Sequence, residues 1–285
     1  MRRSALHGAS IALVAVPALA AGASAGVSVE VDVGGVERSA LVFPGEHADT
    51  SPAPLVLLFH GLGDTSRNFA RALQFEADWP EATVAYPLGR PRADRQNLRG
   101  WQVAPGGDAR SELAFVEALL TGISARYRVD HRRIYAGGFS NGGHLTFALL
   151  TEQPCRFAAF APVGALASGL ESATVPRPVL YLFGRNEPRE HQVDWQRTVV
   201  ALARMNRATG VKREWAPGHT EFVAAPGGAA TVYALYNAGH VWPYAGNEHI
   251  VRFFRSHRLS DAGCADRRQG HHAAGSRPYR SDSSA

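Results

Sequence analysis

The chain has 285 residues, of which 45% are hydrophobic, with 30 lysines and arginines against 25 aspartates and glutamates. This length and apolar content fit one large globular domain with a sizeable core and exclude a fibrous or wholly disordered chain. The positive charges are scattered along the sequence, and no nucleic-acid-binding motif accompanies them. The composition therefore gives no sign of a nucleic-acid partner.

Residues 1–25 have the succession of sequence features that is typical of a secretory signal peptide. Two arginines stand near the start, an apolar stretch covers residues 11–21, and small residues at 23–25 fit the small-x-small cleavage rule. The apolar stretch is too short to span a bilayer comfortably, and no later segment is long and apolar enough to do so. We therefore expect a secreted or periplasmic protein cleaved after Ala25, with an uncleaved membrane anchor as the alternative.

Strands and helices alternate over residues 26–259, which we interpret as one catalytic domain. Residues 27–33 and 36–43 alternate apolar and polar side chains around Gly34-Gly35 and predict a hairpin. Continuous apolar runs predict buried strands, and helical periodicity or helix-start signals predict the helices between them. Further strands are expected at residues 54–59, 82–86, 157–163, 178–183 and 231–237, and in a run that ends at residue 138. Helices are expected at residues 66–73, 145–150, 193–209 and 248–254, and from the N-cap Asp108 to Tyr127.

This alternation is typical of an α/β fold with a mostly parallel central sheet, helices on both faces and, in this chain, an N-terminal hairpin. In such a sheet, catalytic groups gather at the carboxyl ends of the strands. Residues 87–107 interrupt the pattern as a long irregular segment, and a loop of that length is usually functional or disordered. Residues 260–285 are polar with nothing to bury, so we expect a disordered tail.

The most informative stretch is Gly138-Phe139-Ser140-Asn141-Gly142, between a strand-like run and a helix-like run. This is the context of the G-x-S-x-G nucleophile elbow, a sharp turn that presents a serine hydroxyl. Glycine is needed on both sides because a side chain there would collide with the neighbouring backbone. Ser140 is therefore the candidate nucleophile, with a plain glycine-rich turn as the alternative. A second match at residues 22–26 has no strand before it and is interpreted as chance.

A serine nucleophile needs a base within hydrogen-bonding reach and an acid that fixes the tautomer of that base. In hydrolases of this architecture the order along the chain is serine, acid, histidine. Among the histidines after Ser140, only His240 follows a predicted buried strand directly through a glycine turn. Glu187, just after the strand at 178–183, is the first candidate for the acid, and Asp194 is the second.

The oxyanion hole of such an enzyme needs two backbone N–H donors. We expect one from Asn141, the residue after the nucleophile, and the other from Leu62 in the loop at residues 60–64. The histidines and cysteines show no metal-ligand spacing. The chain has an even number of cysteines, Cys155 and Cys264, and is expected to be exported. A disulfide that links the C-terminal tail to the domain is therefore one interpretation.

Several of these motifs together resemble the polyhydroxybutyrate depolymerase-type esterases, a group that includes secreted feruloyl and acetylxylan esterases. The matching segments are His60-Gly61-Leu62-Gly63-Asp64, residues 130–143, residues 157–163 and Gly239-His240-Val241-Trp242-Pro243. The resemblance implies an α/β-hydrolase fold, carboxylic-ester hydrolysis without a cofactor, and Ser140 and His240 as catalytic residues. The chain departs from the family at the acid, where the family usually has aspartate before proline and this chain has Glu187.

We therefore expect a serine esterase whose substrate is a polyhydroxybutyrate-type oligoester or a feruloyl or acetyl ester. Trp101 and Trp242 are the candidate substrate-contacting residues, as flat apolar surfaces beside Ser140. The alternatives are a small-molecule carboxylesterase or acyl thioesterase, and a non-catalytic secreted binding protein on a hydrolase scaffold. The tail is too short and too polar for a polymer-binding module, which favours soluble substrates over crystalline polyester.

Overall fold

The computed structural model describes residues 26–103, 109–259 and Cys264. The strands of the main sheet are β1 (Val27–Val33), β2 (Val36–Phe43), β3 (Ala53–Phe59), β4 (Thr83–Pro87), β7 (Val129–Phe139), β8 (Ala159–Val163), β9 (Val179–Gly184), β10 (Ala208–Ala216), β11 (His219–Ala224) and β12 (Thr231–Tyr236). The α-helices are α1 (Ser66–Leu73), α2 (Phe75–Asp78), α3 (Ala109–Arg126), α4 (Asn141–Glu152), α5 (Arg189–Met205) and α6 (Gly246–Arg255). Two short strands, β5 (Arg90–Arg92) and β6 (Leu98–Gly100), form a separate hairpin, and the 3-10 turns are η1 (Ala93–Arg95), η2 (Pro154–Arg156) and η3 (Leu170–Ser172).

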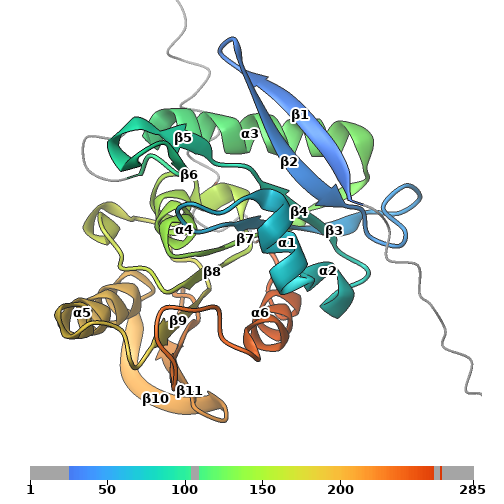
Figure 1. Ribbon diagram of the computed structural model, residues 1–285. Coiled ribbons are helices and arrows are strands. Elements are labelled where there is room, and N and C mark those ends of the chain that lie inside the picture. The colour runs from blue at the N-terminus through green and yellow to red at the C-terminus, as the bar shows by residue number, and fades with distance from the viewer. Residues whose placement is uncertain (1–25, 104–108, 260–263, 265–285) are drawn as a thin grey trace, which may run out of the picture.

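Within the described residues, ten strands make one sheet in the order β1-β2-β4-β3-β7-β8-β9-β12-β11-β10 (Figure 1). In this order, the neighbouring strands β4, β3, β7, β8, β9 and β12 pair in parallel. At one edge β1 pairs with β2 and β2 with β4 in the antiparallel direction, and at the other edge β12 pairs with β11 and β11 with β10 in the same way. The sequence-based expectation of a mostly parallel sheet with an N-terminal hairpin is confirmed, and the hairpin strands have the predicted bounds.

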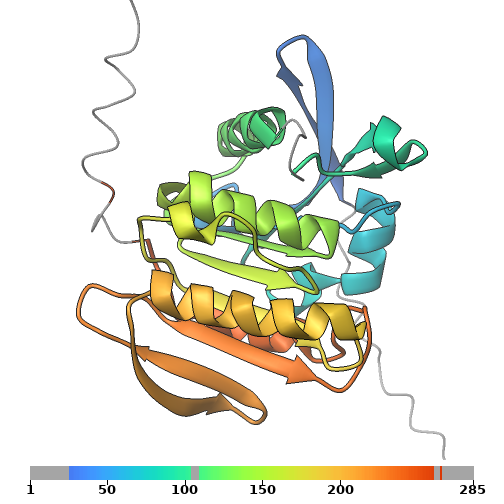
Figure 2. The ribbon, with the colours of Figure 1, turned by 90° about the vertical axis from the view of Figure 1, so that its left-hand side faces the viewer.

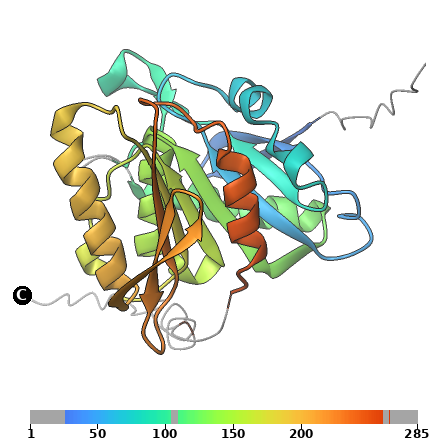
Figure 3. The same cartoon turned by 90° about the horizontal axis from the view of Figure 1, so that it is seen from below.

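Alternate side chains of β3 pack on opposite faces of the sheet. Leu55, Leu57 and Phe59 belong to a core that includes side chains of α3, α4 and α5, whereas Val56 and Leu58 belong to one that includes side chains of α1, α2 and α6. Figure 3 shows α5 and α6 on either side of the sheet. A strand covered on both faces has an apolar residue at every position, which explains why this strand was predictable from its sequence.

The order of the strands creates a switch point between β3 and β7. The chain passes from β3 to β4 on one side, and the next strand of the main sheet, β7, lies on the other side of β3. The loop at residues 60–64 follows β3, and Ser140 follows β7, so both stand at the carboxyl ends of neighbouring parallel strands. Ligand sites of open α/β sheets are usually at this kind of crevice.

Two parts of the fold differ from the sequence-based expectation. The helix predicted over residues 193–209 corresponds to α5, which begins and ends four residues earlier, and the last predicted residues belong to the β10–β11 hairpin that extends the sheet. That hairpin was not predicted because β10 is an exposed edge strand with several charged residues. The segment at 87–107, expected to be irregular, contains the β5–β6 hairpin, which stands apart from the main sheet (Figure 2). Its turn uses Gln96 and Asn97 at φ 54° and 60°, so no glycine marks it in the sequence.

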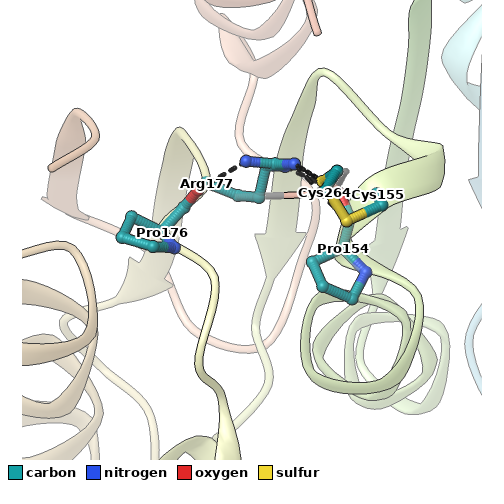
Figure 4. The surroundings of a disulfide bond; sticks show 5 residues. All are labelled: Pro154, Cys155, Pro176, Arg177 and Cys264. Atoms are coloured by element: carbon teal, nitrogen blue, oxygen red, sulfur yellow. Dashed lines mark hydrogen bonds between the residues drawn. A yellow bond between two sulfur atoms is a disulfide. The ribbon is translucent and has the colours of Figure 1, made fainter. Parts of the chain in front are cut away.

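Cys155 in η2 and Cys264 form a disulfide that links positions 109 residues apart (Figure 4). The Arg177 guanidinium lies beside it, donates to the carbonyl oxygens of Pro154 and Pro176 at 2.7 and 2.8 Å, and contacts the Cys264 sulfur. The pairing considered from the sequence is therefore confirmed. The predicted leader, the cap Asp108 and the tail apart from Cys264 lie outside the described residues. No helix among the residues that the structure describes is long and apolar enough to cross a membrane.

Candidate active site

Ser140 lies in the sharp turn between β7 and α4. Its backbone has φ 53° and ψ −117°, a strained conformation for a residue with a side chain. A Cβ at Gly138 would collide with the carbonyl oxygen of Gly142, and a Cβ at Gly142 would collide with the carbonyl oxygen of Phe59. Both glycines of the elbow are therefore required by the close approach of backbone segments, as the sequence pattern predicted.

A continuous hydrogen-bonded chain joins three side chains from the ends of three parallel strands. His240 Nε2 lies 2.8 Å from Ser140 Oγ, and His240 Nδ1 lies 2.7 Å from Glu187 Oε1. The Glu187 side chain is 2% exposed, whereas the His240 side chain is 46% exposed. A buried carboxylate can hold the imidazole in one orientation, while the exposed ring can exchange protons with a substrate.

The structure brings Glu187, and not Asp194, to His240. The Asp194 carboxylate pairs with Arg197 at 3.0 Å, and its side chain is 47% exposed. The second oxygen of Glu187 lies 3.9 Å from Nδ1 of His191, which is one turn along the chain. Of the two candidate acids that the sequence left open, only Glu187 therefore lies within hydrogen-bonding distance of His240.

The loop after β3 passes close to the nucleophile. A Cβ built on Gly61 would lie 3.6 Å from the Cβ of Ser140. Asn141 is the first residue of α4, so its N–H has no acceptor within the helix. Leu62 follows Gly61 in this loop and has no backbone or side-chain acceptor for its N–H among the described residues. The two expected oxyanion donors therefore lie on segments that meet at Ser140.

His60 orients the peptide group that carries the Leu62 N–H. The ring is buried, its Nδ1 lies 2.7 Å from the Gly61 carbonyl oxygen, and its Nε2 accepts the Gly89 N–H at 3.0 Å. Because Nε2 is an acceptor, the proton of the neutral ring is on Nδ1, which donates to Gly61. In a trans peptide the N–H points opposite to the C=O, so this bond turns the Leu62 N–H away from His60. Burial lowers the pKa of His60 and thus favours the neutral ring.

The substrate role expected for Trp101 is contradicted by its burial. The side chain is 0% exposed, and its indole N–H donates to the His60 carbonyl oxygen at 2.8 Å, so the ring has no face to offer a substrate. Trp242 is half-buried, packs edge-on against Phe69 and donates its indole N–H to Asn247 at 3.0 Å. Of these two tryptophans, only Trp242 keeps exposed surface, two residues after His240.

Sequence reasoning missed one further imidazole near the nucleophile, that of His144. His144 is exposed on α4, one turn after Ser140, and its backbone N–H donates to the Ser140 carbonyl oxygen at 3.0 Å. Although the residue as a whole is exposed, the protein around its ring displaces water and lowers its pKa, and the nearby His240 and His191 lower it further. The available signal was the position of His144 four residues after Ser140 and directly before the helix predicted over 145–150, because residues so spaced share a face once the helix extends to them. Among the described residues, no group of three or more histidines, cysteines or acids is placed to hold a metal ion.

Comparison with known proteins decides the family. A family model described as esterase PHB depolymerase matches residues 38–181, a little more than half of the chain. The chain belongs to this esterase family. The candidate esterase NocK of Nocardia uniformis subsp. tsuyamanensis is 29% identical over 242 residues, which cover 70% of this chain and 68% of NocK. The bifunctional acetylxylan esterase/xylanase XynS20E of Neocallimastix patriciarum is 27% identical over 139 residues, 47% of this chain and 19% of that protein.

Solved structures show the same fold. The crystal structure of esterase PE8 has a TM-score of 0.59 at 17% identity and covers 78% of this chain and 99% of its own. The acetyl xylan esterase from Aspergillus awamori has a TM-score of 0.57 at 15% identity and covers 76% of this chain and 93% of its own. The fold is that of the α/β hydrolases. As a member of the PHB depolymerase esterase family, the protein is a carboxylic ester hydrolase.

Proposed function

We propose that the protein is an exported serine esterase in which Ser140, His240 and Glu187 form the catalytic triad. The observation that carries the proposal is the hydrogen-bonded chain from Ser140 Oγ through His240 to the buried Glu187, with contacts of 2.8 and 2.7 Å. A non-catalytic binding protein on the same scaffold would need neither the strained serine nor a buried carboxylate aligned with an imidazole. The geometry therefore favours catalysis over the binding alternative.

In the proposed reaction, His240 Nε2 accepts the proton of Ser140 as Oγ attacks the ester carbonyl carbon. Nδ1 keeps its proton and donates it in a hydrogen bond to Glu187, whose charge stabilises the imidazolium. The N–H groups of Leu62 and Asn141 bind the oxyanion, and the N-terminus of α4 adds positive potential. The tetrahedral intermediate expels the alcohol, which takes the proton from His240. Water then repeats the sequence on the acyl-enzyme, releasing the acid and free serine.

The substrate that we propose is a soluble oligoester of the 3-hydroxybutyrate type or a feruloyl or acetyl ester. The name of the family supports the first, and the acetylxylan esterase activity in the name of XynS20E supports the second. Leu62, Leu98 and Val241 are exposed on or beside the loops of the triad and the oxyanion hole, where they offer apolar contacts. A small-molecule carboxylesterase or acyl thioesterase would use the same residues on another ester or a thioester.

Export is supported by the leader at residues 1–25 and by the disulfide, because disulfides persist in oxidising compartments. The test is N-terminal sequencing of protein recovered outside the cytoplasm of a bacterial host. We expect it to begin near Gly26. A mature protein that begins at Met1 would refute the cleaved signal peptide.

Labelling with a fluorophosphonate tests the catalytic proposal directly, because only an activated serine reacts. We expect the native protein to be labelled and Ser140→Ala to be unlabelled and slower on short-chain p-nitrophenyl esters by several orders of magnitude. Ser51→Ala, which alters an exposed serine in a distant turn, is the matched control and should keep both label and activity. Activity of Ser140→Ala within tenfold of the native protein would overturn the assignment of the nucleophile.

A further inference from the structure

Trp101 contacts both segments that carry the proposed oxyanion donors. Its indole N–H donates to the carbonyl oxygen of His60 at 2.8 Å, two residues before Leu62. Its backbone pairs with the side chain of Asn141 in both directions: the Trp101 N–H donates to Oδ1 at 2.6 Å, and Nδ2 donates to the Trp101 carbonyl oxygen at 3.1 Å. One buried residue thus bridges the loop after β3 and the first residue of α4.

The surroundings leave Trp101 little freedom to move. Its ring packs edge-to-face on Phe59 and parallel to Phe115, with centroids 5.3 and 6.5 Å away. Arg92 Nη1 donates to the Trp101 carbonyl oxygen at 2.8 Å. The preceding residue, Gly100, has no room for a side chain, because a Cβ there would lie 2.5 Å from Asn141 Oδ1 and 2.9 Å from Leu62 Cδ1. The end of β6 is therefore fitted tightly against both donor segments.

The β5–β6 hairpin also contacts the oxyanion loop through its backbone. The Gly63 N–H donates to the Arg99 carbonyl oxygen at 2.7 Å. The Gly89 N–H, just before the hairpin, donates to His60, and Arg99 Nη1 donates back to the Gly89 carbonyl oxygen at 3.1 Å. The hairpin that precedes Trp101 thus supports the oxyanion loop at several points. Among the described residues, only Trp101 forms hydrogen bonds with the Asn141 side chain.

We propose that Trp101 is a positioning residue that fixes the spacing between the two oxyanion donors, Leu62 and Asn141. The inference rests on the proposed function, since it assumes that these N–H groups bind the oxyanion. Both donors must reach one oxygen position at about 2.7–3.1 Å. A small displacement of either one costs more in the transition state than in the bound substrate, where the oxygen carries less charge. Trp101 acts on the reaction only through these two neighbours, because it is buried.

Trp101→Phe tests the bridge, because it removes the indole N–H and leaves an aromatic ring in the core. We expect kcat to fall about 10- to 100-fold with KM within about twofold of the native value. Affinity for a trifluoromethyl ketone, to which Ser140 Oγ adds to give a tetrahedral oxyanion, should fall by the same factor as kcat/KM. Trp195→Phe is the matched control, because the buried indole N–H of Trp195 has no hydrogen-bond partner in the described chain. The control should retain native kcat and ketone affinity.

Asn141→Ala tests the other side of the bridge, since it keeps the backbone donor and removes the side chain that pairs with Trp101. It should show the same pattern, and the double variant should lose less than the product of the two single losses, because both break one bridge. Native kcat in Asn141→Ala overturns the proposal, and so do equal effects of Trp101→Phe and Trp195→Phe. If Trp101→Phe fails to fold, Asn141→Ala decides alone. Failure of the proposed function is distinct: Ser140→Ala would then remain active.

Discussion

Glu187 Oε1 lies 2.7 Å from Nδ1 of His240, although 53 residues separate them in the chain. The contact depends on two loops that follow neighbouring parallel strands, β9 and β12. Backbone hydrogen bonds from Arg185 to Tyr236 and from Asn186 to Ala238, at 2.8 and 3.0 Å, hold these loops together. Gly184 is required there, since a Cβ would collide with the carbonyl oxygen of Gly239. The strand ends therefore place a carboxylate on the histidine even though the residue is glutamate.

Replacing this carboxylate should separate catalysis from substrate binding. We expect Glu187→Gln to lower kcat by several orders of magnitude with little change in KM, because the negative charge stabilises the imidazolium formed in the transition state. Asp194→Asn is the matched control, since its carboxylate pairs with Arg197 away from His240, and it should retain native kcat. Steady-state kinetics on a p-nitrophenyl ester measure both. A larger loss in Asp194→Asn than in Glu187→Gln would reassign the acid.

How far the site could be predicted depended on whether its signal was local. The strained serine and its two glycines lie within five consecutive residues, so the nucleophile elbow could be predicted from the sequence. Glu187 and Asp194 both follow β9, and the structure distinguishes them by the contacts of Glu187 with His240 and of Asp194 with Arg197. Sequence spacing cannot supply that distinction, because it contains no information on how two loops pair.

Trp101 shows the opposite case, in which a local pattern misleads. A tryptophan in a long, arginine-rich segment that follows a strand predicts flat apolar surface beside Ser140. The segment instead forms a hairpin whose turn residues, Gln96 and Asn97, adopt positive φ without glycine. The hairpin returns the chain toward β3 and α3, where the indole packs against Phe59 and Phe115. Burial of that kind is a tertiary property that neither the composition nor the length of the loop predicts.

The neutral state of His60 makes stability depend on pH. Burial lowers the pKa of His60, and the charge of Arg99 lowers it further, whereas the hydrogen bond to Gly61 and the charge of Asp64 raise it in part. Below the usual histidine pKa of about 6.5, the unfolded chain binds a proton that the folded ring resists, so this contribution to stability is present above that pH and is lost as the pH falls. We expect His60→Gln to show a smaller decrease in unfolding free energy between pH 7.5 and 5.5 than the native protein.

Urea unfolding at several pH values measures this difference. Other histidines with lowered pKa, such as His219 and His257, contribute to the same trend and are unchanged in the variant. His47→Gln, which alters a histidine in a turn far from the site, is the control and should keep the native slope. An equal pH dependence in His60→Gln and the native protein would contradict the prediction.

The disulfide should contribute strongly to stability. It closes a loop across a sequence separation of 109 residues, and loss of a native disulfide typically costs about 2–5 kcal/mol. We expect Cys155→Ser to lower Tm by roughly 5–15 °C, measured by thermal denaturation under oxidising conditions. Cys264→Ser and the double variant should lose about as much, since each change breaks the same bond. In the presence of a reductant the native protein should approach the variants, and native Tm values in all three variants would disprove the contribution.

Trp242 is the remaining candidate for substrate contact, two residues after His240. It is half-buried and held in place, because Asn247 accepts its indole N–H at 3.0 Å and donates to Leu73 and Asp78 at 2.7 Å. A fixed aromatic face near the nucleophile should bind large acyl groups better than small ones. We expect Trp242→Ala to raise KM about tenfold for methyl ferulate or 3-hydroxybutyrate oligomers, and much less for p-nitrophenyl acetate.

The same assay defines the physical form of the substrate. Soluble 3-hydroxybutyrate oligomers, methyl ferulate and acetylated xylan should all be hydrolysed faster than a crystalline polyester film, since the exposed apolar side chains beside the proposed site, Leu62, Leu98 and Val241, are few. Trp242→Phe is the control: it keeps an aromatic ring on Phe69 while losing the hydrogen bond to Asn247. It should therefore retain most of the preference for large acyl groups. Film degradation at the rate of the soluble oligomers would reverse the substrate assignment, and native KM values in Trp242→Ala would remove Trp242 from the substrate site.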